Sequence, residues 1–140
     1  MSYDRLDIIS IKNEIDKYLI NTPVLRFDFV DSLCNCEVFF KCENFQHTGS
    51  FKYRAALNAI KSIPNSYKKR GVITHSSGNF AHALSRAASE LNISCYIVMP
   101  SNTPDFKKMS VLKYTENIIE CKPTLEAREH MTKKVMRENN

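Results

Sequence analysis

The chain of 140 residues is long enough for one hydrophobic core and short for two, and its 43% hydrophobic and 25% charged residues are typical of a globular protein. No apolar run reaches transmembrane length, and residues 1–7 lack the basic and apolar segments of a signal peptide, so a cytoplasmic protein without a membrane partner is expected. The net charge of +5 is dispersed, without a basic stripe interleaved with aromatic residues, and therefore does not indicate a nucleic-acid partner.

The N-terminal third consists of short elements separated by polar breaks. A helix is predicted over residues 7–19, because apolar residues recur there at helical spacing. These residues are Ile8, Ile11, Ile15 and Leu19. Pro23 ends the helix early, since proline disfavours helical geometry in the residue before it. Two short strands, over residues 24–27 and 37–42, are predicted to follow around a polar loop.

From residue 48 onward, predicted helices alternate with predicted strands. The helices cover residues 50–62, 79–91, 105–114 and 124–138, and the strands cover residues 71–75, 94–99 and 117–121. The strands begin 23 residues apart, which is the length of a strand–helix–strand crossover. The expected fold class is therefore α/β, an open parallel sheet with helices on both faces and right-handed crossovers.

The five cysteines include no Cys-x-x-Cys pair, so the sequence predicts no metal site. They are Cys34, Cys36, Cys42, Cys95 and Cys121. Most of them lie in or beside predicted strands, where a thiol packs as a small hydrophobe. Reduced and mostly buried thiols are expected.

Lys52 falls on an unusual side of its predicted helix. At about 100° per residue, the polar residues share one face and the apolar residues the other. The polar set is Arg54, Asn58, Lys61 and Asn65, and the apolar set is Ala56, Ala59, Ile60 and Ile63. Lys52 projects onto the middle of the apolar side. An ordinary lysine whose stem covers apolar surface is the more frequent explanation. A buried lysine, in contrast, has a lowered pKa, which suits attack on an aldehyde.

The segment His75-Ser76-Ser77-Gly78-Asn79 joins the first predicted parallel strand to the next helix. Ligands of open α/β sheets bind beyond the carboxyl ends of strands, and amides at a helix start favour an anion. The same residue types are also common helix caps. The segment is therefore either an ordinary N-cap or a binding loop.

Together, these segments resemble two motifs of the fold-type II enzymes that depend on pyridoxal phosphate (PLP), the tryptophan synthase β-like superfamily. Residues 41–56, KCENFQHTGSFKYRAA, resemble the signature that joins K-x-E-x-x-Q to T-G-S-F-K-x-R-G-A. Ser76-Ser77-Gly78-Asn79 resembles the second motif, S-S-G-N-H. Further matches at residues 22–25, 96–100 and 104–108 are similar to the serine racemase and serine/threonine dehydratase branch.

The resemblance implies a role for each matching residue. Lys52 would be the Schiff-base lysine and the acid/base on one face of the substrate, and Ser77 would carry a proton on the other face. Phe51 and Asn79 would contact the PLP ring, while Ser76, Ser77, Gly78 and Asn79 would hold the substrate carboxylate. The protein supplies placement and proton transfer, and PLP supplies the electron sink.

The resemblance also implies a division of the chain and a reaction. Residues 1–47 would belong to the larger domain of such enzymes, and residues 48–140 would form the small α/β domain. The expected reaction is racemisation or dehydration of L-serine or L-threonine, with a homodimer as one expected assembly.

Several positions depart from the family pattern. Phe80-Ala81-His82 stands where the family commonly has His-Gly-Gln or His-Ala-Gln, and Ala55 replaces a glycine. No two of the three glycines are adjacent, whereas the family holds the PLP phosphate with a glycine-rich loop. The alternative is therefore a non-catalytic truncated homologue, or a fragment.

Overall fold

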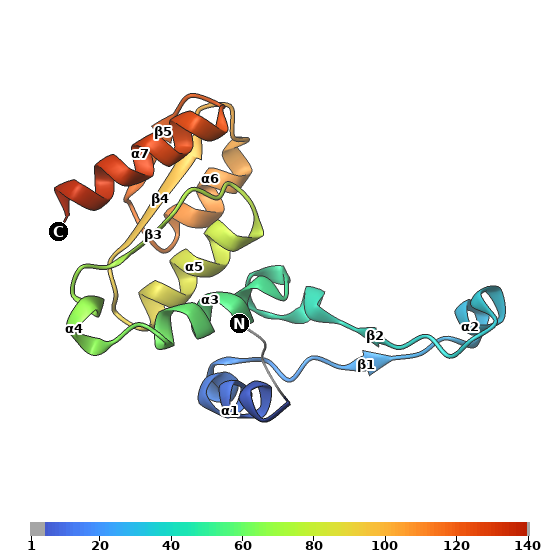
Figure 1. Cartoon of the computed structure of the whole chain (residues 1–140). Coiled ribbons are helices and arrows are strands. Elements are labelled where there is room, and N and C mark those ends of the chain that lie inside the picture. Colours follow the sequence, from blue (N-terminus) through green and yellow to red (C-terminus); the bar gives the residue numbers. More distant parts are fainter. Residues whose placement is uncertain (1–4, 140) are drawn as a thin grey trace. The chain divides into compact units, whose positions relative to one another are not determined.

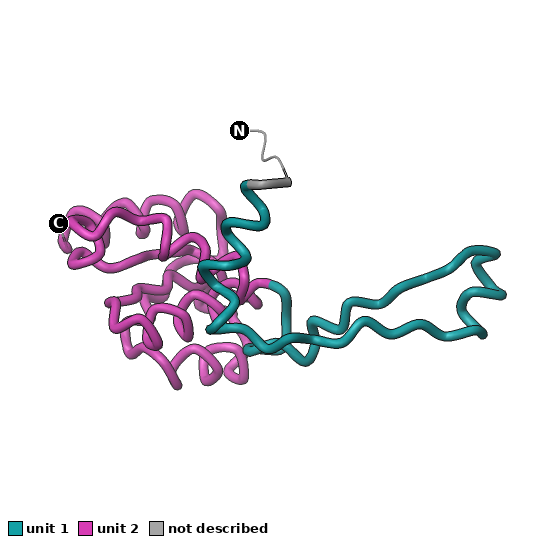
Figure 2. The backbone as a smooth tube through the Cα atoms, turned by 90° about the horizontal axis from the view of Figure 1, so that it is seen from below, with its two compact units in different colours: residues 1–51 teal, residues 52–140 magenta. Residues whose placement is uncertain are grey.

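The computed structural model describes residues 5–139 and divides the chain into two compact units, residues 1–51 and 52–140 (Figure 2). The expected assignment of residues 1–47 to a larger domain and of residues 48–140 to a smaller one stays a prediction.

The first unit is built from short elements. They are α1 (Arg5–Ile15), the 3₁₀ turn η1 (Asp16–Tyr18), β1 (Val24–Leu25), α2 (Asp28–Cys34), β2 (Phe40–Lys41), and the 3₁₀ turns η2 (Glu43–Phe45) and η3 (His47–Gly49). β1 and β2 pair antiparallel, with Val24 opposite Lys41. The prediction of a polar loop between these strands is wrong, because the connection contains helix α2. Asp28 and Asp31 lie in its first turn, where carboxylates favour a helix, and Asn35 ends it in the left-handed conformation.

The second unit contains Lys52 and the Ser76–Asn79 loop, and its elements are labelled in Figure 1. They are α3 (Lys52–Lys61), α4 (Asn65–Lys68), β3 (Val72–Thr74), α5 (Asn79–Glu90), β4 (Cys95–Pro100), α6 (Asp105–Leu112), β5 (Ile118–Cys121) and α7 (Leu125–Glu138). The alternation of strands and helices predicted from the sequence is confirmed. The short helix α4 lies between the helix predicted over residues 50–62 and the strand predicted over residues 71–75, and it was missed.

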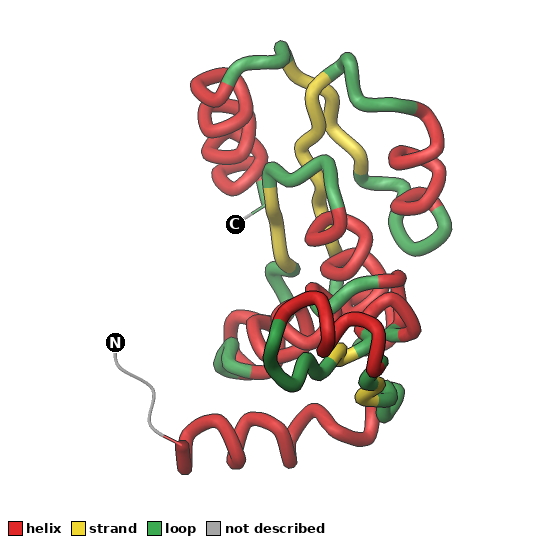
Figure 3. The backbone as a smooth tube through the Cα atoms, turned by 90° about the vertical axis from the view of Figure 1, so that its right-hand side faces the viewer, coloured by secondary structure: helices red, strands yellow, loops and turns green. Residues whose placement is uncertain are grey.

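The strands of the second unit form a parallel sheet in the order β3-β4-β5. Ile73 lies opposite Tyr96, and Ile97 lies opposite Ile118. α5 and α6 lie against one face and α7 against the other, as Figure 3 shows, and α3 packs on α5. The expected α/β class, with helices on both faces of a parallel sheet, is confirmed.

The core of this unit lies between β4 and its covering helices. Val98 and Met99 of β4 are fully buried, as are the small side chains of α5. Those small residues are Ala81, Ala83, Ser85, Ala87 and Ala88. Because alanines leave little bulk on α5, other elements can approach it closely. Helix α5, whose first residue is the predicted site residue Asn79, is therefore packed closely on the sheet.

Candidate active site

Lys52 is the first residue of α3 and is half-buried. The buried face of α3 consists of Tyr53, Ala56, Leu57 and Ile60. Lys52 therefore lies at the border of the buried face, about one quarter turn from its centre, and its expected place in the middle of the apolar side is wrong. Ala59, which was assigned to that side, is exposed. The sequence pattern misled because Tyr53 and Leu57, left out of the apolar set, define the face that packs.

The first turn of α3 is fixed to the last turn of α5. The Tyr53 hydroxyl donates a hydrogen bond to the Glu90 carboxylate, and the Arg86 guanidinium lies 5.6 Å from the centre of the Tyr53 ring. Tyr53 is completely buried. Burial and the Glu90 contact raise the pKa of the Tyr53 hydroxyl above its usual value, so it stays a donor. The backbone of the adjacent Lys52 is thereby held in place.

The turn that precedes Lys52 has an uncommon backbone. Thr48 and Gly49 both have positive φ angles, 64° and 69°. Glycine adopts this region freely, but a β-branched residue does so at a cost. The Thr48 and Ser50 hydroxyls are buried without a hydrogen-bond partner among the described residues. Phe51, which ends the turn, is 56% exposed. Strain and unsatisfied hydroxyls of this kind cluster at functional sites.

The K-x-E-x-x-Q part of the lysine motif has a structural role within the first unit. The Lys41 ammonium donates to the Thr22 carbonyl oxygen at 2.6 Å, and the Thr22 hydroxyl donates to Glu43 at 2.6 Å. The Gln46 amide accepts from the Ile20 N–H at 3.1 Å and donates to the Ile20 carbonyl at 2.9 Å. The three motif residues therefore clamp one extended segment, residues 20–22, through its backbone and the Thr22 hydroxyl.

The Ser76–Asn79 loop leaves the carboxyl end of β3 and opens α5. Gly78 is the N-cap residue of α5, and no side chain caps this helix start. The first intrahelical bond runs from the His82 N–H to the Gly78 carbonyl, at 3.3 Å. The preceding amides of the first turn are therefore unsatisfied within the helix. A Cβ atom added at Gly78 would meet nothing within 4 Å. The structure is compatible with both explanations, because Gly78 occupies the N-cap position and the first amides of α5, which no side chain caps, can meet an anion.

A small pocket of about 190 Å³ lies beside this loop, between the starts of α5 and α6. It is lined by Gly78, Asn79, His82, Phe106, Lys107 and Ser110. His82 rests against the Tyr114 ring at 5.8 Å. Burial, together with Lys113 and Arg86, lowers the pKa of His82. Gly78 and Asn79 are the predicted site residues that meet in this pocket, whereas Phe51, Lys52, Ser76 and Ser77 do not line it.

Arg128 is a candidate that sequence reasoning missed. It lies in the first turn of α7, and its charge acts on Cys121 at the carboxyl end of β5. Its guanidinium Nε atom is buried and has no hydrogen-bond partner within residues 5–139. An unpaired buried guanidinium nitrogen suits an anionic ligand. In the sequence, Arg128 looks like one more charged residue of an amphipathic helix.

The cysteines meet the expectation only in part. Burial raises the pKa of the Cys95 thiol to about 12, and Cys121 is also buried. Cys34 and Cys36 are exposed, so the expectation of mostly buried thiols is wrong for them. In the described part of the chain, no group of three His, Cys, Asp or Glu residues could hold a metal ion.

The residues present fit one part of a PLP molecule. The amine of Lys52 at a half-buried helix start suits the aldehyde carbon of PLP, and the exposed amide side chain of Asn79 suits the ring oxygen. The uncapped start of α5 suits the carboxylate of an amino-acid substrate. The glycine before β3 does not suit the PLP phosphate, because it is required for a tight turn. Gly71 has a φ of 82°, and a Cβ atom there would lie 2.6 Å from the Ser94 carbonyl oxygen.

Three comparisons with known proteins place this geometry in a family. The model of the "Pyridoxal-phosphate dependent enzyme" family matches residues 15–140. Serine racemase of Dictyostelium discoideum is 42% identical over 134 residues, which cover 96% of this chain and 41% of the relative. A maize serine racemase structure superimposes with a TM-score of 0.93 at 37% identity, covering 99% of this chain and 42% of that one. The T.th. threonine deaminase structure gives a TM-score of 0.85 at 29% identity, with coverages of 98% and 43%.

The fold and the site therefore define a class of protein. Its members have a parallel α/β unit with a lysine at the start of one helix and a loop that can bind an anion at the start of another. The chain belongs to the pyridoxal-phosphate-dependent enzyme family, and its resemblance to the serine racemase and threonine deaminase branch is confirmed. Membership indicates pyridoxal 5′-phosphate as the cofactor. The chain spans about two fifths of the length of the relatives it matches. No helix within residues 5–139 is long and apolar enough to cross a membrane.

Proposed function

We propose that this chain carries the lysine-bearing half of a PLP site for racemisation or dehydration of L-serine or L-threonine, with Lys52 as the Schiff-base lysine. One observation carries the proposal. A single folded unit has Lys52 at the start of α3 and an uncapped helix start at Asn79, and the Tyr53–Glu90 hydrogen bond ties the two helices together. The family match supports the same cofactor.

Each residue acts in a defined way in this proposal. The Lys52 amine would remove or add the α-proton on one face of the substrate, and the Ser77 hydroxyl would add or remove it on the opposite face, so that racemisation takes a proton from one face and delivers one to the other. The amides of the Ser76–Asn79 loop and Gly78 hold the carboxylate, since a helix start favours negative charge. The Asn79 amide hydrogen-bonds the ring oxygen, and Phe51 packs beside the ring. PLP, when bound, supplies an electron sink that stabilises the negative charge left on the substrate.

A second candidate is a non-catalytic homologue that retains these motifs. It is favoured by one observation, which is that no two of the glycines at residues 49, 71 and 78 are adjacent to form a phosphate-binding loop. Charge-assisted phosphate contacts are strong, so a chain without them binds PLP weakly. For the first candidate, the PLP enzyme, we also propose a cytoplasmic location and assembly as a homodimer.

The test is absorbance spectroscopy of the purified chain mixed with PLP, followed by borohydride reduction and mass mapping of the labelled lysine. An imine band with the pyridoxyl mass on Lys52 is expected. Serine and threonine turnover are then assayed, with and without added PLP.

Lys61→Ala is the matched control, because Lys61 is the last residue of the same helix and lies more than two turns from Lys52. Lys52→Ala should remove the band and the specific label, whereas Lys61→Ala should keep both. A label scattered over surface lysines, equal in the two variants, would establish the non-catalytic alternative for this chain.

A further inference from the structure

A cationic hollow of about 380 Å³ lies in the second unit, where the ends of α3 and α4 meet the turn that joins α5 to β4. Three lysines line it, since Lys61 ends α3 and Lys68 and Lys69 lie at the end of α4. Of the described residues that line the hollow, none is acidic. Its size falls within the range of pockets that bind small molecules, which is roughly 300–1,000 Å³.

The remaining lining residues supply hydrogen-bond donors and apolar surface. Asn65 of α4 and Asn92 of the turn each carry a side-chain amide that can donate to an anion. Leu91 and Ile93 lie on either side of Asn92 in the chain, line the same hollow and are half-exposed. The hollow therefore combines positive charge with neutral donors and an apolar wall.

Backbone hydrogen bonds hold two walls of the hollow in position. In the turn after α5, the Asn92 N–H donates to the Ser89 carbonyl oxygen at 3.1 Å. Asn92 has a φ of 53°, a left-handed conformation that asparagine adopts more readily than most residues. After α4, the Gly71 N–H donates to the Lys68 carbonyl oxygen at 3.1 Å. Since these segments are already ordered, binding a ligand costs them little conformational entropy.

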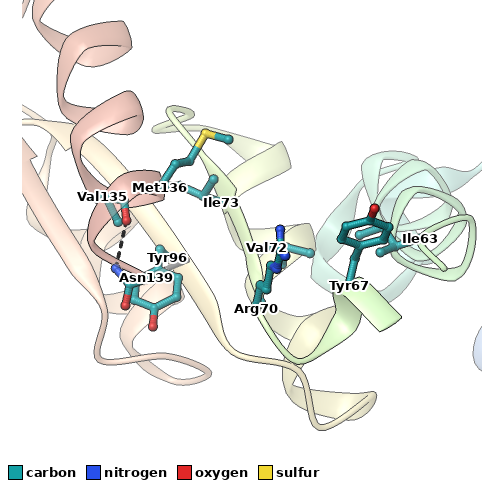
Figure 4. A pocket seen from close by; sticks show the side chains of 10 residues that line it. Ile63, Tyr67, Arg70, Val72, Ile73, Tyr96, Val135, Met136 and Asn139 are labelled. Carbon is teal, nitrogen blue, oxygen red and sulfur yellow. Dashed lines mark hydrogen bonds between the residues drawn. The ribbon is translucent and has the colours of Figure 1, made fainter. Parts of the chain in front are cut away.

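Other basic residues of the second unit lie in different surroundings. Arg70 follows Lys69 in the chain, but its guanidinium lies 5.1 Å from the centre of the Tyr67 ring, and both residues line a separate, mainly apolar hollow (Figure 4). On α7, a third hollow is lined by basic residues together with Glu138, whose carboxylate lies 3.8 Å from the Lys134 ammonium. The hollow at the end of α3 thus has a charge that no lining carboxylate offsets.

Lysines also occur at helix ends for a reason that involves no ligand. A cation in the last turn of a helix complements the helix dipole, which accounts for Lys61 at the end of α3. α4 has only four residues, so its summed dipole is small and gives little reason to gather Lys68 and Lys69 there.

The charge of the hollow indicates the charge of its ligand. A phosphate monoester carries about −1.5 to −2 at pH 7, so two linked phosphate groups match three lysines better than one does. Lysine binds phosphate as a point charge without the fixed fork of arginine, which suits a flexible diphosphate. Leu91 and Ile93 favour a ligand whose diphosphate is joined to an apolar group.

We propose that this hollow binds a small metabolite in which a diphosphate group is joined to an apolar group. Lys61, Lys68 and Lys69 hold the phosphates, and the turn after α5 covers the apolar part. Lys52 and Lys61 are the first and last residues of α3, about 14 Å apart along its axis, so the ligand does not reach the candidate Schiff-base lysine. Binding here does not require PLP.

The test is a titration of the 140-residue chain without PLP or divalent cations, with inorganic pyrophosphate and isopentenyl diphosphate as probes. Calorimetry measures the affinity, and heteronuclear NMR identifies the amides whose shifts change. Saturable binding is expected, with changes at residues 68–69 and 91–93. Isopentenyl diphosphate should bind about three- to tenfold more tightly than pyrophosphate, because its chain covers apolar surface. Inorganic phosphate should bind about tenfold more weakly than pyrophosphate.

Single substitutions identify the contacts. Lys68→Ala and Lys69→Ala should each weaken binding about three- to tenfold, because each removes one charge-assisted contact. Asn92→Gly keeps the left-handed turn and removes the side-chain amide, so it should weaken binding about threefold without unfolding the chain. Arg70→Ala is the matched control from the same basic run and should change the affinity less than about twofold.

Three results would contradict this site. The first is unchanged affinity in both lysine variants, and the second is a loss in Arg70→Ala as large as theirs. The third is a set of amide shifts confined to the Ser76–Asn79 loop. That result would assign the diphosphate to the start of α5 and would leave the proposed role of Lys52 untouched.

Discussion

Thr48 is the residue of the lysine-bearing turn whose backbone suits its side chain least. It is β-branched, has a φ of 64° and a ψ of 11°, and buries a hydroxyl that lacks a hydrogen-bond partner within the described chain. A left-handed conformation costs a residue of this kind about 1–2 kcal/mol. The strained residue lies four positions before Lys52, the predicted Schiff-base lysine. Strained residues tend to occur at functional sites.

Thr48→Gly should raise the free energy of unfolding by about 1 kcal/mol, because glycine adopts this φ without steric strain. Urea unfolding at neutral pH measures the change. Thr48→Val is the matched control, since it removes the unsatisfied hydroxyl and keeps the β-branched side chain. A loss of stability in Thr48→Gly would show that the Thr48 side chain makes contacts worth more than the strain.

At the scale of elements, the Tyr53–Glu90 hydrogen bond joins α3 to α5. Tyr53→Phe should lower the free energy of unfolding by about 1 kcal/mol at pH 8, because it removes this bond and keeps the ring. Burial and Glu90 raise the pKa of the Tyr53 hydroxyl above its usual 10.0. The stability that depends on the protonated hydroxyl is therefore complete below pH 10 and falls as the pH rises above 10.

Urea unfolding of the wild type and of Tyr53→Phe at pH 8 and pH 11 checks this sign. The wild type should lose stability above pH 10 by up to about 1.4 kcal/mol per pH unit more than the variant. Parallel loss in both chains would contradict a role of Tyr53 in the alkaline response. Glu90→Gln separates the effect of the carboxylate charge from that of the hydrogen bond.

The elements that could be predicted from the sequence are those with a clear hydrophobic period. β4 and α5 lie within a residue or two of their predicted bounds. The helix predicted over residues 124–138 is α7, and Thr124 caps it by accepting a hydrogen bond from the Ala127 N–H at 3.1 Å. α2 and α4 were missed because helices of seven and four residues are too short to show a helical period.

Some features of the candidate site could likewise be predicted from the sequence, and others could not. Motif resemblance predicts Lys52 and the Ser76–Asn79 loop as site residues, and this stays a prediction, whereas the helical projection placed Lys52 on the wrong part of α3. A tyrosine counted as neither polar nor apolar turned out to define the packed face. Arg128 and the uncapped start of α5 depend on tertiary contacts, which no local pattern reports.

At the scale of the whole molecule, apolar burial is very unequal between the two units. Ile15 is the one buried apolar side chain found within residues 7–51, while the second unit buries many. Large apolar side chains on β1, α2, β2 and their connections are exposed instead. They are Val24, Leu25, Phe27, Phe29, Leu33, Phe39 and Phe40. Hydrogen bonds such as those of Gln46 therefore hold the first unit with little hydrophobic support.

The first unit should therefore have a lower local stability than the second, because apolar burial is the main contribution that offsets the entropic cost of ordering the backbone. Amides of β1, α2 and β2 should exchange at least about 100-fold faster than those of Ile97, Val98 and Met99 in β4. Hydrogen-exchange mass spectrometry measures both, and limited chymotrypsin digestion should cut between Phe27 and Phe40 first. Equal protection in the two units would mean that the exposed apolar residues of the first unit are covered in solution, by a second copy of the chain or by another protein. Adding a partner that covers those residues should slow exchange in the first unit and leave β4 unchanged.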